Sequence, residues 1–140
     1  MKKVFTSWAA PTLIGFILLN IIAALYRHIY PPNSLIRRID INDLKLLVII
    51  SFLFVLFGAV TEWQRLLKVF EKKLSINRTL LAVSILLADL SLIPFFYWVR
   101  FFRIFPVGKY VLYIFSSEYV LNVISFVSGI LIVRALAYKA

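Results

Sequence analysis

Long apolar stretches separated by short charged segments make up most of the 140-residue sequence. A helix rises about 1.5 Å per residue, so about 20 apolar residues cross a bilayer core about 30 Å thick. Four stretches of this length predict transmembrane helices at about 8–26, 44–63, 79–99 and 110–133. The fourth span begins either near Tyr110 or at Tyr119. The chain is therefore predicted to be an all-α, polytopic membrane protein, folded as a helical bundle.

The segments between the predicted spans are short. The longest, 27–43 and 64–78, are too short to form an independent domain, so residues 1–140 are expected to form a single transmembrane domain. Composition agrees, because 63% of the residues are hydrophobic and 16% are charged. Soluble globular proteins are about 45–50% apolar and about 25% charged, so a soluble domain is excluded.

The charge is strongly basic, with 16 Lys and Arg against 6 Asp and Glu. These cations flank hydrophobic spans on both sides, as membrane anchoring requires, so nucleic-acid binding is not expected. With four spans, the side that carries both termini holds nine of the cations and the opposite side holds seven. This bias weakly favours cytoplasmic termini, and the Met-Lys-Lys start weakly favours a bacterial cytoplasmic membrane.

The segment 64–78 has an amphipathic pattern, with Leu66, Phe70 and Leu74 on one helical face and cations on the other. It is predicted either to lie in the headgroup plane and bind anionic lipids, or to continue the second span. A second basic segment follows the third span and is dense in aromatic residues. A belt of aromatic side chains at the membrane–water interface explains this density better than a binding site for a quinone, pigment or isoprenoid. The expected lipid-headgroup contacts are Arg65, Lys68, Lys72, Lys73, Arg100 and Arg103.

Two acidic residues lie within predicted spans, where an ionisable group costs about 2.5–3.5 kcal/mol on insertion scales. Asp89 is near the middle of the third span, and Glu118 is the ninth residue from Tyr110. Two neighbouring carboxyls would share a proton or bind a cation, because like charge and desolvation both oppose double ionisation. Alternatively, each carboxyl meets another chain or a hydroxyl, or Glu118 is simply interfacial.

The fourth span carries a stripe of polar and small residues on one helical face: Glu118, Asn122, Ser125 and Gly129. The last two form a small-xxx-small pair, which permits close approach of another helix backbone. This helix-packing face is therefore predicted to contact protein or water instead of lipid.

The sequence contains no Cys, a single His, and no recognisable phosphate loop, nucleophile elbow or metal-ligand spacing. No catalytic residue, metal or cofactor is therefore expected, and the chain is not predicted to be an enzyme. The leading hypothesis is a non-catalytic integral subunit of a larger membrane complex, which contributes helix packing and lipid contacts to other integral membrane subunits. The alternative is a small homo-oligomeric transporter, flippase or channel that uses Asp89 and Glu118 as intramembrane proton or cation groups.

Overall fold

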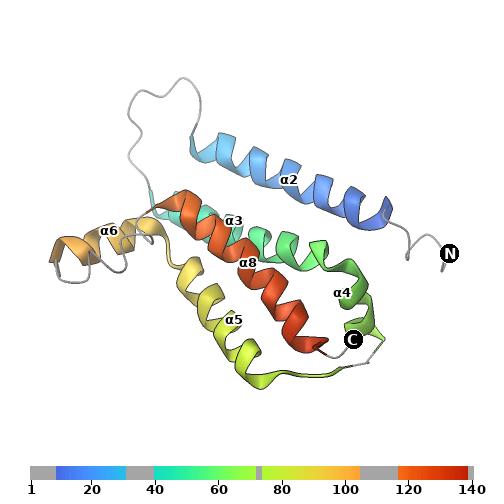
Figure 1. The fold of residues 1–140 in the computed structure, drawn as a ribbon. Coiled ribbons are helices and arrows are strands. Elements are labelled where there is room, and N and C mark those ends of the chain that lie inside the picture. The colour runs from blue at the N-terminus through green and yellow to red at the C-terminus, as the bar shows by residue number, and fades with distance from the viewer. Residues whose placement is uncertain (1–8, 31–39, 72–73, 105–116, 139–140) are drawn as a thin grey trace.

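The computed structural model describes residues 9–30, 40–71, 74–104 and 117–138. These residues form six helices (Figure 1): α2 (Ala9–Ile29), α3 (Ile41–Thr61), α4 (Trp63–Phe70), α5 (Arg78–Leu92), α6 (Phe95–Ile104) and α8 (Glu118–Leu136). Among them α2, α3 and α8 are each long and apolar enough to cross a membrane, and α5 with α6 would make a fourth span if the bent pair is taken together. The predicted all-α membrane bundle is confirmed.

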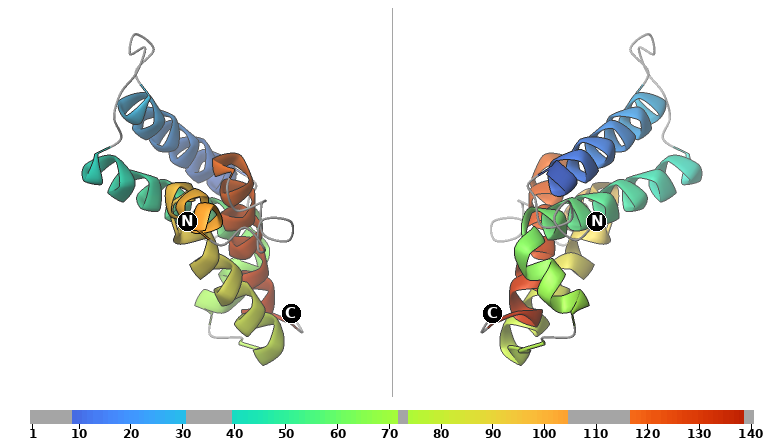
Figure 2. Two further views of the ribbon diagram at one scale, coloured as in Figure 1. Left: turned by 90° about the vertical axis from the view of Figure 1, so that its left-hand side faces the viewer. Right: turned by 90° about the vertical axis from the view of Figure 1, so that its right-hand side faces the viewer.

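The central pair of the bundle is α3 and α8, which run parallel to each other. Figures 1 and 2 show α2 on one side of this pair and α5 on the other. At one end Arg134, near the end of α8, bonds Glu62, which directly follows α3, at 2.6 Å. At that same end α5 begins antiparallel to α8, because the Asn77 amide donates to the Ala135 carbonyl at 2.8 Å. We call this the Glu62 end, and the opposite end, where Tyr30 meets Glu118, the Glu118 end.

Two glycines bring α3 and α8 into backbone contact. A Cβ atom added to Gly58 would lie 2.0 Å from the Phe126 carbonyl oxygen, and one added to Gly129 would lie 2.0 Å from the Val55 carbonyl oxygen. Both distances are far below van der Waals contact, so the two helices approach to a separation that only glycine permits at these positions.

A capping box explains where α3 begins. The Ile41 amide donates to the Asp40 side chain at 2.7 Å, and the Asp40 amide donates to the Asp43 carboxylate at 3.0 Å. These bonds satisfy amides that the first turn of a helix leaves without intrahelical partners. The helix therefore begins at Ile41, three residues before the predicted boundary, and Asp43 is buried.

The third predicted span, 79–99, consists of two helices in the structure, α5 and α6. The helix α5 ends at Leu92, and α6 leaves it at an angle of 85°. The cause is Pro94, which has no amide hydrogen to donate and disfavours helical geometry at the preceding residue. Ile93 accordingly has extended backbone angles, with φ −73° and ψ 116°.

The amphipathic helix predicted over 64–78 is shorter than expected. The helix α4 ends at Phe70, and Ser75 pairs instead with the end of α8, where its amide donates to the Leu136 carbonyl. Glu62 both ends α3 and precedes α4, so α4 follows the second span directly after a break. The predicted start of the fourth span near Tyr110 lies outside the described residues, and α8 begins at Glu118.

We expect Arg134→Leu to lower the free energy of unfolding by about 1 kcal/mol, since Arg134 donates two charge-assisted hydrogen bonds to one Glu62 oxygen, at 2.6 and 2.8 Å. Glu62 is only 19% exposed, whereas Arg134 is 51% exposed and remains partly screened by solvent. Unfolding in mixed SDS micelles, followed by tryptophan fluorescence, measures the change. Arg65→Leu is the control, because its contact with Glu62 is longer, at 3.7 Å. Equal losses in both variants would contradict a specific role for Arg134.

Candidate functional site

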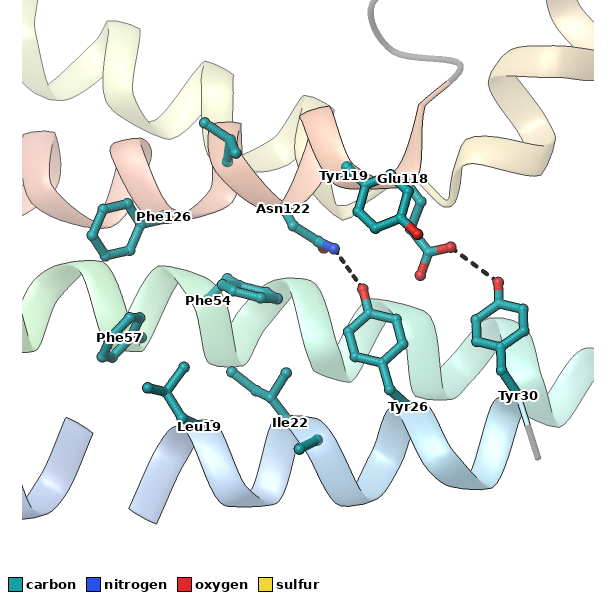
Figure 3. Close-up of a pocket in the computed structure, with 12 residues that line it drawn as sticks. Leu19, Ile22, Tyr26, Tyr30, Phe54, Phe57, Glu118, Tyr119, Asn122 and Phe126 are labelled. Carbon is teal, nitrogen blue, oxygen red and sulfur yellow. Dashed lines mark hydrogen bonds between the residues drawn. The ribbon is translucent and has the colours of Figure 1, made fainter. Parts of the chain in front are cut away.

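A cleft of about 960 Å³ lies between α2 and α8, with α3 as its floor (Figure 3). Its size falls within the range of small-molecule sites, about 300–1,000 Å³. The helix α2 packs chiefly on α3, which leaves the space between α2 and α8 open. The lining residues are Leu19, Ile22, Ala23, Tyr26 and Tyr30 from the α2 side, Phe54 and Phe57 from α3, and Glu118, Tyr119, Asn122, Val123 and Phe126 from α8.

The hydrogen-bonding side chains of the cleft gather at the Glu118 end. Tyr30 donates its phenolic hydrogen to Glu118 Oε2 at 3.0 Å, and Asn122 Nδ2 donates to the Tyr26 hydroxyl oxygen. Figure 3 shows both tyrosines reaching across from α2 toward α8. Burial and the adjacent Glu118 carboxylate raise the pKa of the Tyr30 phenol above its usual range, so Tyr30 is a neutral donor at physiological pH. These two bonds join α2 to α8 across the opening.

The second carboxyl oxygen of Glu118 has no hydrogen-bond partner among the described residues. Glu118 Oε1 is buried, and no described residue donates a hydrogen bond to it. A buried acceptor without a donor costs about 1–3 kcal/mol, and a charged one costs more. The polar end of the cleft therefore holds a carboxylate whose hydrogen-bonding capacity the described residues do not fill.

Asp89 lies on a different surface of the molecule. It is exposed on α5 and has no hydrogen bond or ion pair with the residues that the structure describes. Counted along the helix axis from Asn77 at about 1.5 Å per residue, it lies about 18 Å from the Glu62 end of the bundle. Glu118 instead faces the α2 side of α8. The structure thus does not bring the two carboxyls to one site.

The predicted packing face of α8 is occupied within the chain. Asn122, Ser125 and Gly129 are buried, and Gly129 lies against the α3 backbone. Ser125 donates its hydroxyl hydrogen to the Leu121 carbonyl of its own helix at 3.0 Å. The predicted contact of this face with protein is therefore made within the chain at Gly129, which packs on α3.

The expected headgroup cations lie on two short helices. Arg100 and Arg103 are exposed on α6, at the Glu118 end, and Arg65 and Lys68 are partly exposed on α4, at the Glu62 end. Lys72 and Lys73 lie outside the described residues. Within the described part of the chain, no group of three or more acidic or histidine side chains is placed to hold a metal ion.

Sequence reasoning missed Tyr26 and Tyr30 as members of a site. Their spacing of four places both hydroxyl groups on one face at the end of a span, and this pattern is the signal that could have revealed them. Phe54 and Phe57 carry no comparable signal, because every span of the chain is rich in large apolar residues.

Comparison with known proteins identifies no relative. No family model matches the chain, and neither a curated protein nor a solved structure shows significant similarity to it. The fold and the cleft define the class: the chain is a helical membrane protein whose three or four apolar helices form a bundle with a laterally placed aromatic cleft.

Proposed function

We propose that the protein is a non-catalytic integral subunit of a larger membrane complex, and that it contacts another integral membrane protein through the outer face of α5. The observation that carries this proposal is the exposed Asp89. A carboxylate about 18 Å into the bundle, on a surface without a described partner, is unfavourable in contact with lipid. A neighbouring protein with a Lys, Arg or hydroxyl donor opposite Asp89 would remove this cost.

The surroundings of Asp89 support a protein contact. Leu86 and Ile85 lie three and four residues before it on the same helix, about one turn away, and both are exposed. The other face of α5 buries Ser84 and Ser91, with α8 as the principal neighbouring helix. The outer face is thus an apolar stripe that includes one acidic group, a pattern that suits a specific helix–helix contact better than lipid.

Copurification from native membranes in mild detergent tests the proposal. We expect Asp89→Asn and Leu86→Trp each to reduce the retained partner at least 10-fold, the first through the lost charge and the second through steric blocking. Leu13→Trp is the matched control, since Leu13 is 61% exposed on α2 and Leu86 is 59% exposed on α5. Wild-type protein that migrates alone in native mass spectrometry, or variants that retain the partner at the wild-type level, would refute this function.

The proposed location is a bacterial cytoplasmic membrane with both termini in the cytoplasm. The described helices support termini on one side, because α2 begins and α8 ends at the Glu62 end of the bundle. The α4 cations and Arg134 also lie at this end, in agreement with the small excess of positive charge there. Anionic lipids are proposed to contact Arg65 and Lys68 on this side and Arg100 and Arg103 on the other.

A small homo-oligomeric transporter, flippase or channel is a second candidate, favoured by the unpaired Glu118 oxygen in the cleft. Asp89 and Glu118 face different surfaces, so such a protein would use the two carboxyls separately or across a subunit boundary. Proton-coupled or cation flux in proteoliposomes tests it. A flux that persists unchanged in Asp89→Asn and Glu118→Gln would exclude the two carboxyls from transport.

A further inference from the structure

The cleft between α2 and α8 has the length of one membrane leaflet. The residues that line it on the α2 side extend from Leu19 to Tyr30, which directly follows α2, a length of about 16 Å at about 1.5 Å per residue. Half of a bilayer core about 30 Å thick is about 15 Å. Because the apolar helix α2 ends at Ile29, we place the Glu118 end of the cleft at the membrane surface. The far end, lined by Leu19, Phe57 and Phe126, then lies at about the depth of the bilayer centre.

Polarity changes along the cleft as it does along a lipid molecule. The Tyr30–Glu118 and Tyr26–Asn122 pairs lie at the surface end. Below them the lining is apolar and aromatic, with Phe54 on the α3 floor (Figure 3). A headgroup fits the first part and an acyl chain fits the second.

The polar end favours a headgroup that donates hydrogen bonds and carries positive charge. Glu118 Oε1 is buried and accepts no hydrogen bond from a described residue. Within the described part of the chain, the ion pairs involve Glu62, at the opposite end, and none involves Glu118. A primary ammonium group supplies both the charge and the N–H donors.

We infer that the cleft is a binding site for one phospholipid with a primary-ammonium headgroup, of the phosphatidylethanolamine class. The ammonium pairs with the Glu118 carboxylate, and one acyl chain lies along the aromatic floor between α2 and α8. The two tyrosine hydrogen bonds hold α2 and α8 together at the polar end, and they oppose the separation that a protein helix about 10–12 Å in diameter would require there. This inference is independent of the proposed contact through α5.

Lipid titration of the delipidated, full-length protein followed by native mass spectrometry tests the inference. The probes are phosphatidylethanolamine, phosphatidylcholine and phosphatidylglycerol with identical acyl chains. Choline has the same positive charge but no N–H donor, and phosphatidylglycerol has hydroxyl donors but a negative charge. We expect the wild-type protein to bind phosphatidylethanolamine at least 5-fold more tightly than either of the others.

Glu118→Gln is expected to abolish this preference, because the amide still accepts a hydrogen bond from Tyr30 but has no charge to pair with ammonium. Asp89→Asn is the matched control, a carboxylate-to-amide change outside the cleft, and it should keep the preference. Ala23→Trp fills the apolar part of the cleft and should weaken the binding of all three lipids at least 5-fold. The inference is overturned if the wild type binds the three lipids equally, prefers phosphatidylglycerol, binds none of them, or keeps its preference in Glu118→Gln.

Discussion

Alanine at Gly129 or at Gly58 is expected to cause the largest loss of stability of any single methyl addition in this protein. Each new Cβ would lie 2.0 Å from a backbone carbonyl oxygen of the neighbouring helix, Val55 for Gly129 and Phe126 for Gly58. A backbone carbonyl inside a helix cannot rotate away as a side chain can. The two central helices must therefore separate. We expect the free energy of unfolding of each variant to fall by at least about 3 kcal/mol, which is at or beyond the upper limit of ordinary overpacking.

The control for these variants is Gly15→Ala on α2. Its added Cβ would lie 3.2 Å from the ring edge of Phe57, a side chain that can shift by a few tenths of an ångström. We expect Gly15→Ala to change stability by less than about 1 kcal/mol, since alanine also favours the helix intrinsically. Unfolding in mixed SDS micelles measures all three variants. Similar losses at Gly15 and Gly129 would contradict the backbone contact between α3 and α8.

The substitution Ser84→Leu is expected to cause the second largest loss of stability. Ser84 is completely buried on α5, whose principal neighbour is α8. Its hydroxyl donates to the Leu81 carbonyl of its own helix at 2.9 Å, so it forms no bond that joins the helices. A leucine at this position must push α5 away from the bundle, and we expect the free energy of unfolding to fall by about 2–3 kcal/mol.

Ser84→Ala separates the effect of volume from the effect of the hydroxyl. We expect the free energy of unfolding of this variant to lie within about 0.5 kcal/mol of the wild-type value. The lost hydrogen bond is intrahelical, and the backbone carbonyl keeps its helical partner. Val83→Leu, at an exposed neighbouring position, shows the effect of a larger side chain outside the interface. A large loss in Ser84→Ala would mean that the hydroxyl, and not the close packing, holds α5 in place.

The two proposed contacts of this protein lie on opposite sides of the α3–α8 pair. Asp89 marks the outer face of α5, and Glu118 marks the cleft beside α2. The experiments therefore separate them: Asp89→Asn should affect a protein partner and leave lipid selectivity unchanged. Glu118→Gln should affect lipid selectivity and leave copurification unchanged.

Much of the fold could be predicted from apolar length alone. Lipid offers no hydrogen-bond partners, so a long apolar stretch must be helical wherever it crosses the membrane. The boundaries of the first two spans accordingly lie within a few residues of α2 and α3. The stripe of Asn122, Ser125 and Gly129 was also visible from spacing, because helical periodicity places residues on a face whatever lies against it.

The partner of that stripe was decided by the tertiary structure. Spacing identifies a face that requires close contact, but Gly58 in another helix supplies the complementary surface, and a long apolar span gives no sign of which glycine that will be. The same holds for the cleft, where Tyr26 and Tyr30 meet Asn122 and Glu118 across 88 or more residues of sequence.

The sequence by itself thus determined the class of protein, the approximate positions of its apolar stretches, and which residues are too polar to face lipid. The tertiary structure decided that α8 packs on α3 within the chain, that the third apolar stretch turns at Pro94, and that Glu118 and Asp89 face different surfaces. The physical reason is that insertion into a bilayer depends on each segment's own composition. Packing between helices depends on the complementary shape of two surfaces that are distant in the sequence.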